Sequence, residues 1–260
     1  MLSTFASYQA ITRNITTSLA STAAEPAVQN QTQYYLANIG KVKTIDNFLN
    51  NYQLFSFAMK AFGLESMTYA KGMIRQLLEG GIKDSKALAN TLTDPRYKAL
   101  ATAFDFADNG TSTTSAAAAT TDVVNQYVRQ TLEDDAGNQN AGVRLALYFQ
   151  RMAPTIQTAY NILADPALLK VAQTVLQIPP QSSLQDLSVQ AQTITSKLNL
   201  KDLQDPTKLS QFVQRFAVLY DMENSTTTTQ PANALLVGQG LPGIGVDLLT
   251  SLQGLKLGGN

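Results

Sequence analysis

Apolar residues recur at three- and four-residue steps along most of this chain, which is the spacing of one face of an α-helix. The strongest run spans residues 45–62, where a second apolar stripe lies beside the first and only a narrow polar strip remains. The first stripe consists of Ile45, Phe48, Leu49, Tyr52, Phe55, Met59 and Phe62. Such a segment is typical of a helix that is buried among other helices. We therefore expect one central helix over about 45–62, with Thr44 as its N-cap and Gly63 as its left-handed C-terminal residue.

Weaker helical patterns fill much of the remaining chain. They are found at residues 66–79, 85–92, 122–133, 142–163, 166–177 and 206–222. The pattern predicts an all-α fold, a multi-helix bundle around the buried central helix. Residues 48–104 and 149–216 carry their elements in a similar order, which leaves two interpretations open: two related helical halves, or repeated use of common helix start signals.

Three Asp–Pro dipeptides mark helix starts, at Asp94, Asp165 and Asp205. The carboxylate can accept hydrogen bonds from the free N–H groups of the first turn, and proline at the first helical position has no N–H to leave unpaired. We expect these aspartates to be helix caps and not ligands. Because Asn caps a helix as well as Asp, the Asp94→Asn substitution is expected to be nearly neutral.

The chain divides into three parts by composition. Residues 1–31 are thin in large apolar residues, which predicts a weakly ordered N-terminal helical segment. Residues 32–224 form the predicted helical domain, with a low-complexity linker near 109–121. Residues 225–260 form a Gly/Leu/Thr-rich C-terminal tail. We expect the domain to fold without its two ends, and the ends to fold on a partner or on a second copy of the chain.

Charge and hydropathy narrow the functional classes. The chain has 19 basic and 19 acidic residues, so its formal net charge is zero. This balance argues against non-specific nucleic-acid binding, which depends on neutralising phosphates. No apolar run reaches the length of a transmembrane segment, and the N-terminus lacks the basic start and apolar core of a cleaved signal peptide.

The chain contains no cysteine and no histidine. It therefore has no disulfide, no thiolate nucleophile, no catalytic triad that uses histidine, and neither of the commonest transition-metal ligands. We expect a protein that is not an enzyme, with no catalytic, cofactor-binding or metal-binding residues. A hydrolase that uses carboxylates alone stays open as an alternative, and would require two carboxylates facing each other at about 5–10 Å.

Two other motifs have simpler explanations than a functional site. Gly238, Gly240 and Gly243 match the spacing of a dinucleotide-binding loop, but too few residues follow for the rest of that unit, so we interpret them as part of a Gly-rich tail. Glu133 and the two aspartates after it lack the spacing of a calcium loop. We interpret that cluster as the solvated acidic end of a helix.

The helix patterns together resemble one known family. A helix carrying Asp-Phe-Leu leads to Ala-Phe-Gly-Leu, a basic helix then ends in Leu-Glu, and an Asp-Pro-Arg-Tyr start leads to a Phe. The matching residues are Asp46, Phe48, Leu49, Ala61, Phe62, Gly63, Leu64, Lys71, Arg75, Leu78, Glu79, Asp94, Arg96, Tyr97 and Phe104. In these motifs the chain resembles the bacterial domain-of-unknown-function family 1217, over residues 34–220 and most strongly over 44–106.

The resemblance implies an all-α fold and assigns no catalytic residues. Members of the family are often encoded beside flagellar genes, which is an association and not a mechanism. We therefore expect a non-enzymatic helical protein of flagellar structure or assembly that acts by protein–protein contact, with a flagellar component or by self-association. It would be flagellum-associated, either cytoplasmic or exported without a cleaved signal peptide. The alternative is a helical binding module for a peptide or small ligand unrelated to motility.

Overall fold

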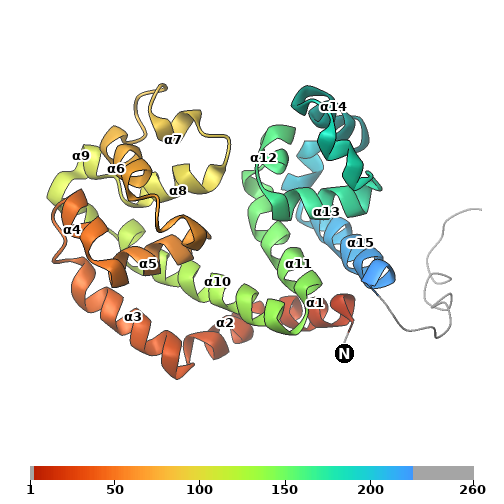
Figure 1. Ribbon diagram of the computed structural model, residues 1–260. Coiled ribbons are helices and arrows are strands. Elements are labelled where there is room, and N and C mark those ends of the chain that lie inside the picture. The colour runs from red at the N-terminus through yellow and green to blue at the C-terminus, as the bar shows by residue number, and fades with distance from the viewer. Residues whose placement is uncertain (1–2, 225–260) are drawn as a thin grey trace, which may run out of the picture. The chain divides into compact units, whose positions relative to one another are not determined.

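The computed structural model describes residues 3–224, and every regular element among them is a helix (Figure 1). The predicted all-α class is confirmed. Buried apolar side chains gather in two separate cores, one within residues 28–128 and one that joins residues 136–216 to Tyr8. That the two cores descend from one duplicated half stays a prediction.

The first core is enclosed mainly by the elements between residues 26 and 119. They are α3 (Pro26–Ile39), α4 (Ile45–Asn50), α5 (Tyr52–Ala61), η1 (Glu65–Met67), α6 (Lys71–Gly80), α7 (Leu88–Thr91), α8 (Pro95–Ala103), α9 (Phe106–Asn109), η2 (Gly110–Ser115) and η3 (Ala117–Ala119).

The second core is enclosed by the elements that follow residue 140, together with the first helix of the chain. They are α1 (Thr4–Arg13), α11 (Ala141–Met152), η4 (Ala153–Thr155), α12 (Ala159–Leu163), α13 (Pro166–Leu176), η5 (Pro180–Leu184), α14 (Leu187–Lys197), η6 (Leu200–Gln204) and α15 (Pro206–Asn224). The end of α11 at Met152 agrees with the break expected from Pro154.

Helix α10 (Thr121–Gln139) belongs to both cores. Its N-terminal half packs on α5 and places Val123 in the first core, whereas its C-terminal half packs on α11 and places Ala136 in the second. Helix α2 (Ile15–Ala23) lies against α10 and connects α1 to α3. One continuous helix therefore holds the two cores in register.

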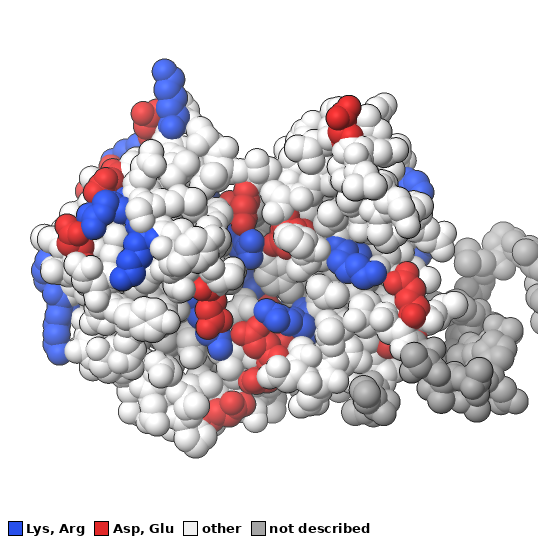
Figure 2. Space-filling view, in the orientation of Figure 1, with Lys and Arg blue, Asp and Glu red and all other residues white. Residues whose placement is uncertain are grey.

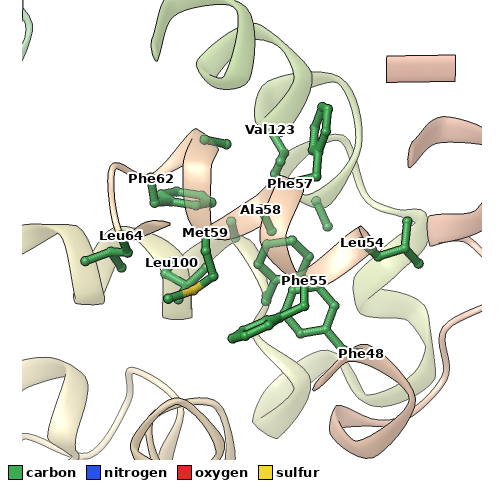
Figure 3. Packing of buried hydrophobic residues seen from close by; sticks show 14 of the residues in the cluster. Phe48, Leu54, Phe55, Phe57, Ala58, Met59, Phe62, Leu64, Leu100 and Val123 are labelled. Atoms are coloured by element: carbon green, nitrogen blue, oxygen red, sulfur yellow. The ribbon is translucent and has the colours of Figure 1, made fainter. Parts of the chain in front are cut away.

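Helix α5 is buried on several sides, as Figure 3 shows. Phe55 meets Phe48 edge to face, with ring centroids 5.7 Å apart. Phe57 points the other way and stacks between Tyr35 and Tyr127, at 4.3 and 3.9 Å. A helix that contributes to packing on more than one side has few positions left for polar residues, which explains the dense apolar pattern in the sequence.

The predicted single helix over 45–62 is wrong in one respect, because the structure divides it into α4 and α5. Asn51 between them has an extended backbone (φ −85°, ψ 91°), and its side chain accepts a hydrogen bond from the Leu54 N–H at 3.1 Å. The break changes the helical phase, so that Tyr52, expected to face inward, is 66% exposed. The predicted ends are found: the Thr44 hydroxyl caps α4, and Gly63 has φ +69°.

The N-terminal segment, residues 1–31, was predicted to be weakly ordered. Its described part forms α1, α2 and the start of α3, and it packs on the rest of the chain. Tyr8 of α1 is 2% exposed and lies in the second core. Asp221 of α15 accepts hydrogen bonds from the Thr4 and Phe5 N–H groups at 2.8 and 3.3 Å, which caps α1. Removing residues 1–31 would therefore expose part of a core, so we no longer expect residues 32–222 to fold unchanged.

The predicted linker near 109–121 is packed against the first core. Thr114 is fully buried, and its hydroxyl donates to the Val42 carbonyl at 2.7 Å. Ala119 is also buried, and its carbonyl accepts from the Tyr35 hydroxyl at 2.7 Å. The change from one core to the other occurs inside α10 and not at this segment.

The predicted C-terminal tail, 225–260, and its glycine motif lie outside the described residues. Within residues 3–224, none of the helices combines the length and the apolar character that crossing a membrane requires.

Candidate functional site

Charged side chains that are buried or partly buried gather where the two cores meet. Glu133 on α10 is completely buried and accepts hydrogen bonds from Arg151 on α11, at 2.7 Å from Nε and 2.8 Å from Nη2. Arg129, one turn before Glu133, donates to the same carboxylate at 3.0 Å. The interpretation of Glu133 as part of a solvated helix end is therefore wrong. Its partner Arg151 also donates to the Gln130 side-chain carbonyl at 2.9 Å.

Two of the three predicted Asp–Pro caps meet at one guanidinium group, that of Arg96. Arg96 donates to both oxygens of Asp94, at 3.0 Å from Nε to Oδ1 and 2.7 Å from Nη2 to Oδ2, and it donates to the Gly63 carbonyl at 2.9 Å. Its Nη2 lies 3.7 Å from Oδ2 of Asp165. Asp94 also accepts from the Arg96 backbone N–H, so it is a helix cap as predicted and an ion-pair partner in addition.

Asp165 links this group to the second core. One of its oxygens caps α13 by accepting from the N–H groups of Ala167 and Leu168, at 2.8 and 3.2 Å. The other accepts a hydrogen bond from the hydroxyl of Tyr148, whose ring lies 5.1 Å from the Arg151 guanidinium carbon. Burial raises the pKa of the Tyr148 hydroxyl above its ordinary value, with a partly opposing effect of Arg96, so the hydroxyl remains a donor at neutral pH.

These residues, which we call the junction cluster, are Arg96, Arg129, Arg151, Asp94, Asp165, Glu133, Tyr148 and Gln130. Each cation in it faces a carboxylate, so the charges of the cluster are paired with one another. A buried ion group of this kind contributes less to stability than its Coulomb energy suggests, because desolvation opposes it. Its clearest effect is to fix how α8, α10, α11 and α13 are aligned. Figure 2 shows blue and red side chains close together in the hollow between the two cores.

A cleft of about 640 Å³ lies beside the junction cluster, lined by residues of both cores. Phe62 and Ala103 belong to the first core and Ala99 lies beside them on α8, whereas Gln157 and Asn161 lie next to Ile156 and Ile162 of the second core. The Asn161 side chain donates to the Thr93 carbonyl across the cleft at 2.8 Å. The cleft therefore lies between the helices of the two cores, and this side-chain hydrogen bond joins its two sides.

Several polar groups of the cleft have no partner within the described residues. They are the side chains of Lys98, Asp122, Gln126 and Gln157. Asp122 is the one carboxylate in this lining, so the pair of facing carboxylates required by the hydrolase alternative is not present there. Among residues 3–224, no group of three or more acidic side chains is placed to hold a metal ion.

A different kind of surface is found where η5 ends and α14 begins. Leu184 and Leu187, three residues apart, are 90% and 62% exposed. Large aliphatic side chains this open to water are unfavourable unless another surface covers them.

None of these sites was predicted as functional from the sequence. The caps Asp94 and Asp165 were identified, but not that Arg96 joins them, because that contact depends on how α8 and α13 pack. The pair Arg129 and Glu133 has the four-residue spacing of a helical ion pair, which is the one local signal that points to the junction cluster.

These features define the chain as an all-α protein whose two apolar cores share one helix, α10, and meet at a cluster of ion pairs. Residues 61–209 match the family described as "Protein of unknown function (DUF1217)". That match spans more than half of the chain, so the chain belongs to this family, as the resemblance predicted. Gly63, Asp94 and Arg96, which help to carry the resemblance, meet in or beside the junction cluster.

The chain is also similar to protein AGR_C_984 from Agrobacterium tumefaciens, known from an X-ray crystal structure. The two are 43% identical, with a TM-score of 0.78, and the similarity covers 86% of this chain and 97% of that one. No protein of curated function matches the chain.

Proposed function

We propose that this chain is a non-enzymatic helical protein that serves flagellar structure or assembly through contact with another protein. The flagellar part rests on the association of the family with flagellar genes. The contact part rests on one observation, the two leucines at the start of α14, Leu184 and Leu187, which are 90% and 62% exposed. A partner that covers them removes apolar area from water, at about 25 cal/mol per Å².

A deletion strain of the bacterium that encodes the chain tests the proposal. We expect its swimming zone in soft agar to shrink and the wild-type chain to restore it. A chain with Leu184→Ser and Leu187→Ser is expected not to restore swimming, because serine removes the apolar contact without entering a core.

The matched control is Leu36→Ser, on α3 of the other core, where the leucine is 45% exposed. This variant is expected to restore swimming. A deletion strain that swims normally would contradict the flagellar proposal. Full rescue by the double variant would contradict the assignment of the contact to α14.

The second candidate is a helical binding module for a peptide or small ligand unrelated to motility. The cleft beside the junction cluster favours it, because about 640 Å³ lies within the usual range of ligand sites, about 300–1,000 Å³. Normal swimming of the deletion strain would leave this candidate as the better explanation.

A further inference from the structure

The cleft lies between helices that pack on the two cores. Ala99 and Ala103 of α8 and Gln126 of α10 lie on one side, and Gln157 lies on the other, just before α12. Apart from α10 and the N-terminal helices, the cores are joined here by polar side chains, among them the hydrogen bond from Asn161 to the Thr93 carbonyl.

The chemistry of the cleft selects among classes of ligand. Gln126 and Gln157 have no partner within residues 3–224, and each side-chain amide offers both a donor and an acceptor. Lys98 and Asp122 cancel in charge, so the cleft does not favour a phosphate, a nucleic acid or a strongly charged peptide. The backbone of an extended peptide, by contrast, presents N–H and C=O groups that amide side chains can pair with.

The apolar part of the lining limits the size of the side chains that such a peptide could carry. Ala99 and Ala103 leave shallow space above α8, and Phe62 offers one larger apolar surface. Small apolar or hydroxyl side chains fit this shallow lining better than long charged ones.

We propose that this cleft binds an extended, uncharged peptide segment of a partner protein, with Gln126 and Gln157 hydrogen-bonded to the peptide backbone. The small side chains of the peptide pack on Ala99 and Ala103. This inference rests on the proposed function only in taking a protein as the partner. It does not require the partner to be flagellar, and it concerns a surface different from the leucines of α14.

The experiment uses the full-length chain and a phage-displayed library of random dodecapeptides. Peptides enriched on the wild-type chain are synthesised, and their affinities are measured by calorimetry. We expect the enriched peptides to be low in charge and rich in small residues. Ala99→Trp, at an exposed position of α8, fills the cleft and is expected to lower the affinity at least about tenfold, whereas Gln126→Ala and Gln157→Ala are each expected to lower it about three- to tenfold.

Matched controls lie on α3, away from the cleft. Ala37→Trp and Gln33→Ala make the same substitutions at exposed helical positions and are expected to leave the affinity unchanged. Circular dichroism of every variant checks that the fold is retained. The inference is overturned if no peptide is enriched, if the enriched peptides carry a strong net charge, or if Ala99→Trp binds them as well as the wild type does.

Swimming of the deletion strain separates this inference from the proposed function. If the strain swims normally while Ala99→Trp abolishes peptide binding, the cleft inference stands and the flagellar proposal fails. If the deletion stops swimming and the Ala99→Trp chain loses peptide binding yet restores swimming, the cleft binds peptides but is not the flagellar contact. If Ala99→Trp keeps both peptide binding and rescue, the cleft inference fails alone.

Discussion

The two cores of this chain are built from different residues. The first is rich in aromatic rings, with Phe48 stacked on Phe104 at 4.5 Å and Phe57 stacked on Tyr127 at 3.9 Å. The second is mainly aliphatic, and its closest ring pair, Phe149 with Phe212, is 5.2 Å apart. The first core is organised around α5, and the second around α11, which packs on α1, α10, α13 and α15.

This difference explains why the two cores are unequally visible in the sequence. A helix buried on several sides is apolar at most positions, so α5 produces the densest pattern in the chain. In the second core α11 is also buried at neighbouring positions, from Ala146 to Phe149, but α1 contributes Tyr8 from the far end of the sequence. A core completed by a residue so distant in the chain can be recognised only when the helices that face each other are known.

The junction between the cores differs from both of them, because ion pairs connect the helices there. Glu133, Arg151 and Arg129 lie on the shared side of α10 and α11, and Arg96 joins Asp94 to Asp165. Ion pairs require particular geometry, whereas apolar contacts tolerate sliding. The junction therefore sets the alignment of the cores while the apolar residues supply most of the stability.

The largest expected effect is in the first core. Phe55→Ala is expected to lower the free energy of unfolding by about 3–5 kcal/mol, through lost burial and the cavity left behind. Urea denaturation measures this loss. Tyr52→Ala, at the exposed start of the same helix, is the control and is expected to cost less than about 0.5 kcal/mol.

Hydrogen exchange on the Phe55→Ala chain shows whether the cores are coupled. Because α10 belongs to both, we expect the amides of α11 to lose protection together with those of α5. Retained protection in α11 would show that the second core is stable by itself.

A smaller effect is expected at the junction. Glu133→Gln leaves Arg151 and Arg129 without their buried carboxylate and is expected to cost about 3 kcal/mol, with little change between low and high salt. The control is Asp202→Asn, which removes the exposed ion pair with Lys208 and is expected to cost less than about 1 kcal/mol, an effect that salt weakens further. A loss below about 1 kcal/mol for Glu133→Gln would mean that the junction cluster does not align the cores.

The smallest effect compares two Asp–Pro caps that look alike in the sequence. Asp205 caps α15 by accepting from the N–H groups of Thr207 and Lys208, and Asn is expected to replace it at a cost below about 0.5 kcal/mol. Asp94 also pairs with Arg96, so Asp94→Asn is expected to cost about 1.5 kcal/mol and is no longer expected to be neutral. Thermal denaturation of both variants decides this, and equal costs would show that the ion pair at Asp94 contributes nothing.

Features that depend on a few neighbouring residues could be predicted from the sequence. The Thr44 cap, the left-handed Gly63 and the three Asp–Pro caps each involve contacts within a few positions of the chain, so their signals are local. The break at Asn51 was missed although it is local, because the apolar stripe continues through it and conceals the cap. The all-α class followed from periodicity, since that pattern reports which face of each helix is buried.

Which charges are buried and which surfaces stay open depends on how the helices pack, so neither could be predicted from the sequence. Arg151 reaches Glu133 from another helix, Arg96 reaches Asp165 from the other core, and the cleft exists because α8 and α12 do not close on each other. An acidic residue near the end of a helix looks the same in a sequence whether water or an arginine surrounds it. Most helices and their caps could be predicted from neighbouring residues, although the break at Asn51 could not. The site could not be predicted, because burial and ion pairing depend on residues that meet only after folding.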